Sequence, residues 1–254
     1  MNYFTSDPLQ TFWLIGSFVV WAALLFGGFV RGRPTASNPQ RIPRLARIGS
    51  SVALVSAAWS LFWLARSSPH GGYAALIAIG MTLDFIGDSI LAGFIGVSTP
   101  DNATLGGIAM FGIGHIAYIG AILLLATIER LADTAHLVST TALWLVIGVA
   151  GWYAPVFRGR QNDGLTAQHL AALPYALLLA SVAGIASGLA IQDARFLGLA
   201  AGTALFVISD LILAGTLFKA WTFPGIHDVV WLTYGPAQAL IVGTMVIGLV
   251  IPRT

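Results

Sequence analysis

The chain has 254 residues with a formal net charge of +2; 57% of the residues are hydrophobic and 9% are charged. About a quarter of the residues of an ordinary soluble domain are charged, so this composition excludes a water-facing surface over most of the molecule. The sequence contains no cysteine, which excludes disulfide bonds and thiolate chemistry. We therefore expect a protein that lies in a membrane.

Apolar runs of about 20 residues, separated by short polar breaks, follow one another along the sequence. Runs of this length cross a hydrocarbon core of about 30 Å as α-helices. They lack the strict alternation of porin strands, which leaves helices as the spanning structure. We predict an all-α, polytopic membrane protein with about eight transmembrane helices and a single domain over residues 1–254. The predicted spans are Thr11–Val30, Ile48–Ala65, Gly72–Val97, Ala103–Thr127, Leu137–Phe157, His169–Ile191, Phe196–Phe218 and Asp228–Ile251.

The first run precedes an arginine-rich stretch, Arg31 to Arg47, and has neither a basic residue before it nor a small-residue cleavage site. It is therefore predicted to be a retained helix rather than a signal peptide. Lysine and arginine accumulate on the cytoplasmic side, which places both termini outside the cytoplasm. The predicted cytoplasmic loops hold Arg31, Arg33, Arg41, Arg44, Arg47, Arg158, Arg160 and Lys219, and the other side holds Arg66, Arg130, Arg195 and Arg253.

This basic cluster lies directly beside a membrane helix. Anionic lipid headgroups are therefore its expected partner, and nucleic acid is not. We expect a multi-pass protein of the cell membrane, plasma or inner.

An internal repeat joins the third and seventh predicted helices. Residues 86–93 (IGDSILAG) and 208–215 (ISDLILAG) are identical at six of eight positions. Because four helices separate the two copies, both run in the same direction through the membrane. The helices that follow match more weakly. The repeat predicts two parallel four-helix halves, approximately 1–130 and 131–254, with a polar site at their junction. Chance recurrence of apolar residues is the alternative.

Three acidic residues, Asp84, Asp88 and Asp210, lie well inside predicted spans. A charged carboxylate at the centre of a membrane costs roughly 2.5–3.5 kcal/mol, so such residues must be hydrogen-bonded, protonated or both. Intramembrane acids commonly mark functional sites. The structural alternative is that each one only hydrogen-bonds a neighbouring helix.

Other polar residues share these helices. His115 lies in the middle of the fourth span with Tyr118 on the same face, and Tyr234 and Gln238 are four residues apart in the eighth. They could converge with the aspartates on one cavity. Alternatively, His115 is a satisfied core residue, and the tyrosines, Tyr175 among them, are helix-to-helix hydrogen-bond donors.

Several kinds of site are set aside by their missing motifs. The sequence has no glycine-rich phosphate loop, no His-Glu-x-x-His pattern and no G-x-S-x-G motif. His115 with three aspartates could hold a metal, but one histidine offers no ligand spacing to support it. We predict no metal and no cofactor.

Four segments, in this order, resemble the YhhN/TMEM86 lysoplasmalogenase family: residues 85–91 (FIGDSIL), residues 107–111 leading to His115 and Tyr118, residues 205–210 (LFVISD) and residues 234–238. The resemblance covers roughly the last two thirds of the chain. It implies a polytopic membrane hydrolase that cleaves the vinyl ether bond of lysoplasmalogens, or of a related lysolipid, to a fatty aldehyde and a glycerophospho-base. Two places depart from the family pattern: Asp84, and Gly235 with Pro236.

The resemblance implies that the family's two aspartates correspond to Asp88 and Asp210. Vinyl ether hydrolysis needs a protonated acid and a base, and two neighbouring buried carboxyl groups can supply both. We expect lysolipid substrate and membrane lipids as partners. The same acids would also serve a proton-coupled transporter or proton pathway, and a lipid-binding role without catalysis is a third possibility. The residues expected to position substrate or water are His115, Tyr118, Tyr234, Gln238, Asp84 and Ser209.

Overall fold

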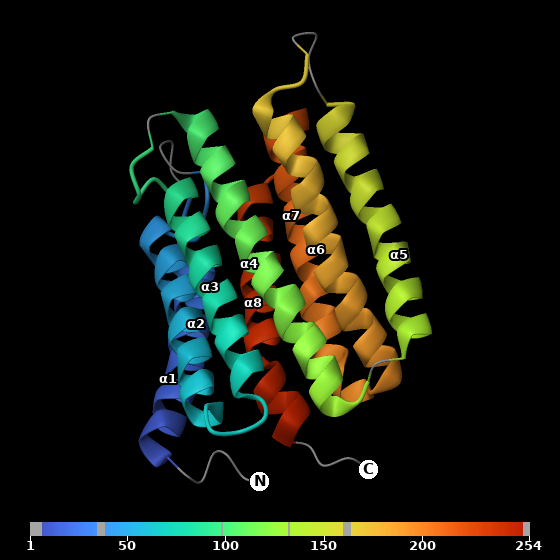
Figure 1. The fold of residues 1–254 in the computed structure, drawn as a ribbon. Coiled ribbons are helices and arrows are strands. Elements are labelled where there is room, and N and C mark those ends of the chain that lie inside the picture. Colours follow the sequence, from blue (N-terminus) through green and yellow to red (C-terminus); the bar gives the residue numbers. More distant parts are fainter. Residues whose placement is uncertain (1–6, 35–38, 98, 132, 160–163, 251–254) are drawn as a thin grey trace.

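The computed structural model describes residues 7–34, 39–97, 99–131, 133–159 and 164–250. These residues form eight long α-helices and no strand, which confirms the predicted all-α class (Figure 1). Three residues of the predicted spans and loops lie outside the described residues: Ile251, Arg160 and Arg253. The helices are α1 (Pro8–Arg31), α2 (Arg44–Ala65), α3 (Gly71–Leu91), α4 (Pro100–Glu129), α5 (Thr134–Trp152), α6 (Ala167–Gln192), α7 (Leu197–Lys219) and α8 (Ile226–Val250).

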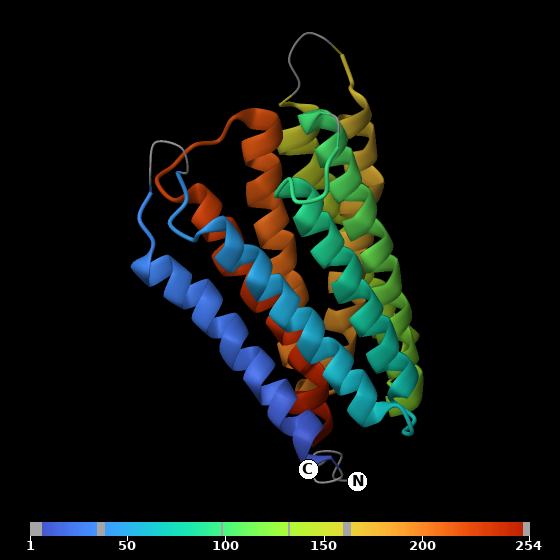
Figure 2. The same ribbon diagram turned by 90° about the vertical axis from the view of Figure 1, so that its left-hand side faces the viewer.

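The helices run alternately up and down in one bundle (Figures 1 and 2). Among the described residues, each helix packs against the next in the chain except α4, which packs against α6 and not against α5. In the described part of the chain, α1 to α7 are long and apolar enough to cross a membrane. Two short elements extend this set: a π-helical turn, η2 (Tyr153–Phe157), after α5, and a 3-10 turn, η3 (Ala194–Phe196), before α7. The chain therefore has the architecture of a multi-pass membrane protein.

Helix α8 lies between the first three helices of the chain and α7. It packs against α7 and also contacts α1, α2 and α3, while α4 contacts α6. Figure 1 shows α1 to α4 on one side, α5 to α7 on the other, and α8 behind them. Residues late in the sequence, such as Tyr234 and Gln238, are thereby brought against the third helix. The division into two parallel repeats stays a prediction.

Helix α3 ends earlier than predicted. Its last residue is Leu91 rather than Val97, because Gly93 adopts a φ of 68°, a left-handed conformation that glycine favours. At the equivalent place in the repeat, Gly215 stays inside α7. Asp88 therefore lies in the last turn of α3, near the side of the bundle that carries the arginine-rich loop.

Helix α2 begins earlier than predicted, at Arg44 rather than Ile48. Arg44 and Arg47 are thus helical residues and not part of a loop. The loop before them is held by Asp228 at the start of α8. Its carboxylate accepts backbone hydrogen bonds of 2.9 to 3.0 Å from Arg41 and Ile42. The arginine-rich segment is therefore fixed against α8.

The opposite side of the bundle carries a separate ionic cluster. Arg195 contacts the carboxylates of Glu129 at 3.0 Å and Asp193 at 2.7 Å. His70 lies 2.9 Å from Glu129. This cluster ties the start of α3 to the end of α4 and to η3, far along the bundle from Asp88.

Candidate active site

Asp88 is held by two helices other than its own. Its Oδ2 accepts hydrogen bonds from Ser51 on α2 at 2.6 Å and from the Tyr234 hydroxyl on α8 at 3.0 Å. The residue is only 5% exposed. No hydrogen bond from a described residue reaches Oδ1, so one carboxyl oxygen is fixed and the other is available.

A second tier of polar residues lies behind Asp88. Asp84, one turn earlier on α3, is completely buried. Its Oδ2 accepts hydrogen bonds from Gln238 at 2.7 Å and from Tyr118 at 2.8 Å. Gln238 also contacts the Tyr234 hydroxyl at 3.1 Å. Hydrogen bonds therefore connect Asp84 to Asp88 through Gln238 and Tyr234.

Asp210 lies in the middle of α7 and accepts a hydrogen bond from the Tyr175 hydroxyl on α6. The neighbouring Ser209 donates to the Val230 carbonyl on α8 at 3.1 Å, which ties α7 to α8. His115 donates from Nδ1 to the Phe111 carbonyl at 2.7 Å. Its ring also meets Tyr175 edge-on, with the ring centroids 5.6 Å apart.

Asp88 and Asp210 face the same cavity. It has a volume of about 420 Å³, and Tyr175, Ser209 and Tyr234 also line it. This volume lies within the range of roughly 300–1,000 Å³ that is common for ligand sites. Gln40, Arg47 and His227, from the arginine-rich side, form its polar mouth, and most of the remaining lining is apolar. The apolar residues are Leu91, Ala92, Pro100, Ala103, Ile108, Phe111, Leu213, Leu217, Val230 and Trp231.

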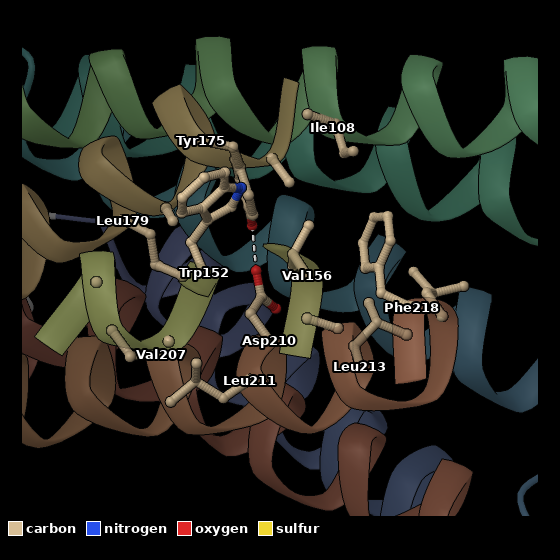
Figure 3. A pocket seen from close by; sticks show the side chains of 16 residues that line it. Ile108, Trp152, Val156, Tyr175, Leu179, Val207, Asp210, Leu211, Leu213 and Phe218 are labelled. Carbon is tan, nitrogen blue, oxygen red and sulfur yellow. Dashed lines mark hydrogen bonds between the residues drawn. The ribbon is translucent and has the colours of Figure 1, made fainter. Parts of the chain in front are cut away.

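A smaller pocket of about 90 Å³ adjoins the larger cavity at the Tyr175–Asp210 pair, among α4, α5, η2, α6 and α7 (Figure 3). It shares Asp210, Tyr175, Ile108, Leu213 and Leu217 with the larger cavity. Among the described residues that line it, only Asp210 has an ionisable carboxyl group. Figure 3 shows the Tyr175–Asp210 hydrogen bond surrounded by Trp152, Val156, Leu213 and Phe218.

The sequence model of the YhhN family matches residues 44–245. The chain belongs to the YhhN family. No curated protein and no solved structure matches it significantly. The YhhN match confirms the resemblance seen in the sequence, and it spans all residues that line the two cavities except Gln40.

Within this YhhN chain, the residues expected at the site fall into two groups. Asp88, Asp210, Ser209 and Tyr234 line the larger cavity. Asp84, His115, Tyr118 and Gln238 do not line it, and all four are almost completely buried behind it. Whether either group acts on a substrate stays a prediction.

The helix-to-helix hydrogen bond expected of Tyr175 is present, because its hydroxyl on α6 donates to Asp210 on α7, although the sequence did not indicate this partner. Sequence reasoning missed two residues that the structure places at the site, Ser51 and Arg47. Ser51 belongs to no motif, and Arg47 lies in α2 rather than in the loop expected from the sequence. No described group of three or more His, Asp or Glu side chains could hold a metal ion.

Proposed function

We propose that this YhhN protein hydrolyses the vinyl ether bond of lysoplasmalogens, or of a related lysolipid, to a fatty aldehyde and a glycerophospho-base. The observation that carries the proposal is the common cavity of Asp88 and Asp210, two acids on helices that are four apart in sequence. Family membership and the apolar lining of the cavity also support it.

The reaction consumes one water molecule in three steps. An acid transfers a proton to the β-carbon of the vinyl ether, and the C=C electron pair forms the new C–H bond, leaving an oxocarbenium ion. Water adds to the cationic carbon and loses a proton to a base, which gives a hemiacetal. The hemiacetal then breaks its bond to the glycerol oxygen, which takes the proton held by the base. The hemiacetal hydroxyl gives its own proton to the deprotonated acid as its C–O bond becomes the aldehyde C=O bond. The acid is thereby protonated again and the base ionised again.

Two carboxyl groups in one apolar cavity suit this sequence. Burial of two negative charges together is costly, which favours one protonated and one ionised carboxyl group. The protonated group supplies the acid, and the ionised group stabilises the cation and accepts the proton of water. Asp88 has one oxygen held by Ser51 and Tyr234, and Asp210 has one held by Tyr175. In each case the second oxygen is available to a substrate.

The experiment is an assay of aldehyde release by purified protein with lysoplasmalogen in D2O. If the carbon is protonated as proposed, each fatty aldehyde carries one deuterium on the carbon next to its carbonyl. A lysolipid with a saturated ether in place of the vinyl ether is the control and yields no aldehyde. Absence of aldehyde, or aldehyde without this deuterium under conditions where the product does not exchange, would contradict the proposal.

A further inference from the structure

The two cavities adjoin one another and differ in polarity. Arg47, Gln40 and His227 line the larger cavity together with the two carboxyl groups, and the small, mainly apolar pocket shares Asp210 with it. A single-chain ether phospholipid has matching groups: a charged phosphate, an ether-linked glycerol and a hydrocarbon chain. Resting on the proposed function, we infer that Arg47 binds the substrate phosphate while the hydrocarbon chain starts in the pocket beside η2.

Arg47 differs from the other arginines of its segment in its surroundings. It is half-buried and lines the cavity, and its guanidinium carbon lies 5.6 Å from the centre of the Trp231 ring. No described carboxylate forms an ion pair with it. Arg44, one turn earlier, is exposed, does not line the cavity and lies over Phe94 at 4.1 Å. Arg47 is therefore the cation that a bound anion in the cavity can reach.

Arg47 lies one helical turn from Ser51, the residue that donates to Asp88. Ser51, which donates to Asp88, follows Arg47 by four residues on α2, and such neighbours are about 5–6 Å apart at their Cβ atoms. In a glycerophospholipid, five bonds separate the ether oxygen at position 1 from phosphorus. Five bonds of about 1.5 Å sum to about 7.5 Å, and the zigzag of an extended chain shortens the end-to-end distance to roughly 6 Å. A phosphate at Arg47 thus leaves the ether within reach of Asp88.

The pocket beside η2 suits the start of a hydrocarbon chain. Its walls include Ala172 and Ala176 of α6, Ala214 of α7 and Val156 of η2. Apart from Asp210, Tyr175 and Trp152, its lining carries no polar side chain, which suits an apolar ligand. Its volume of about 90 Å³ has room for only the first methylene groups, and the Tyr175–Asp210 pair lines both this pocket and the larger cavity.

The first experiment measures binding without catalysis, with purified protein in an uncharged maltoside detergent. The probes are a 1-O-alkyl-glycerophosphocholine, whose saturated ether cannot be cleaved by this route, and a 1-O-alkylglycerol without phosphate. By calorimetry, the wild type should bind the phospholipid at least tenfold more tightly. Arg47→Gln should remove this difference, because it deletes the charge that pairs with phosphate, whereas Arg44→Gln should keep it.

Three results would overturn the inference at the phosphate end. They are equal binding of the two probes by the wild type, an unchanged preference in Arg47→Gln, and an equal loss in Arg44→Gln. Inorganic phosphate is a further arm of this experiment. Competition by phosphate alone at micromolar concentration would indicate a site for free phosphate instead of a lysolipid.

The second experiment fills the apolar pocket. Ala214→Phe places a ring in it and should weaken binding of the alkyl phospholipid about tenfold, whereas Ala201→Phe, at an exposed position of the same helix, should not. Ala172→Leu is a smaller filling of the opposite wall and should weaken binding less. Thermal unfolding identifies variants that fail to fold. Unchanged binding in both folded pocket variants would overturn the inference at the chain end.

The binding inference and the proposed hydrolysis can fail separately. Probe binding that depends on Arg47, without any aldehyde from lysoplasmalogen, would remove the hydrolysis and keep the lysolipid site. Aldehyde release that is indifferent to Arg47→Gln in both KM and kcat would keep the hydrolysis and remove the assigned orientation.

Discussion

The hydroxyl of Tyr234 on α8 donates a 3.0 Å hydrogen bond to Asp88 on α3, 146 residues earlier in the chain. The same carboxyl oxygen accepts from Ser51 on α2. Three helices thus fix one side of a carboxyl group whose other side faces the cavity. The position of Asp88 is a property of the assembled bundle and not of its own helix.

Tyr234→Phe should reduce the rate of aldehyde release. The substitution removes one of the two donors to Asp88 and takes the hydroxyl from Gln238, a loss of roughly 1–3 kcal/mol. At the transition state, a loss of this size lowers kcat about 5- to 150-fold. The control is Tyr153→Phe, whose ring is 48% exposed and stacks on Phe157. Equal turnover in the two variants would speak against a role for the Tyr234 hydroxyl.

Tyr175 and Asp210 should behave as one unit. Tyr175→Phe removes the only described hydrogen-bond donor to Asp210, and we expect about tenfold slower turnover with little change in unfolding temperature. Because the tyrosine acts through the carboxylate, the double variant Tyr175→Phe/Asp210→Asn should be no slower than Asp210→Asn alone. Kinetics of the four proteins in a double-mutant cycle measure this, and additive losses would mean that the two residues act independently.

Gly114 on α4 packs closely against Asp84 of α3, because it has no side chain. A Cβ at this position would lie 2.6 Å from Asp84 Oδ1 and 3.2 Å from the Gly80 carbonyl oxygen. Gly114→Ala should therefore destabilise the protein by about 1–3 kcal/mol, as overpacking of a core does.

Gly120→Ala, on the same helix, is the matched control, because its nearest neighbour would be Leu76 at 3.5 Å, an ordinary contact. It should be neutral or stabilising, since alanine is the better helix former. Denaturant unfolding in detergent compares the two variants, and similar stabilities would show that the contact at Gly114 is easily relieved.

The transporter alternative predicts that protons move across the bilayer. We expect no such movement, because the described hydrogen bonds do not extend through the bundle. The described chain of hydrogen bonds runs from Asp88 to Asp84 and Tyr118. Two turns further along α3 and α4, the core consists of buried apolar side chains such as Ile77 and Leu125. We therefore expect no pH-dependent flux in reconstituted vesicles that hold active protein. Flux lost in Asp88→Asn or Asp210→Asn would instead support a proton pathway.

The fold could be predicted largely from sequence, because in a membrane the length of an apolar run determines the length of its helix. Helix ends were less certain. The end of α3 depends on the left-handed conformation of Gly93, whereas Gly215 in the similar segment remains helical. The eight-residue pattern around each glycine is nearly the same, so it does not indicate which helix ends there. At Gly215 the Trp221 ring, which lies outside this pattern, occupies the space where a Cβ would be.

The two aspartates could be singled out from sequence because acids are costly in a membrane and because they recur in a repeat. Their common cavity could not, since it depends on α8 packing against α3 as well as α7. The same packing separates Tyr234, which lines the cavity, from Gln238, which lies behind it. Tyr175 could not be assigned to Asp210, because nothing in either local sequence relates the two residues.

Aldehyde release by purified Asp88→Asn, Asp210→Asn and Asp133→Asn tests the central claim most directly. The three substitutions are chemically identical, and Asp133→Asn is the control, since the Asp133 side chain is exposed and does not line the cavity. We predict that Asp88→Asn and Asp210→Asn each lose at least a hundredfold in kcat, whereas Asp133→Asn stays within about threefold of the wild type. Undiminished release by Asp88→Asn or Asp210→Asn, with the variant folded, would contradict the account.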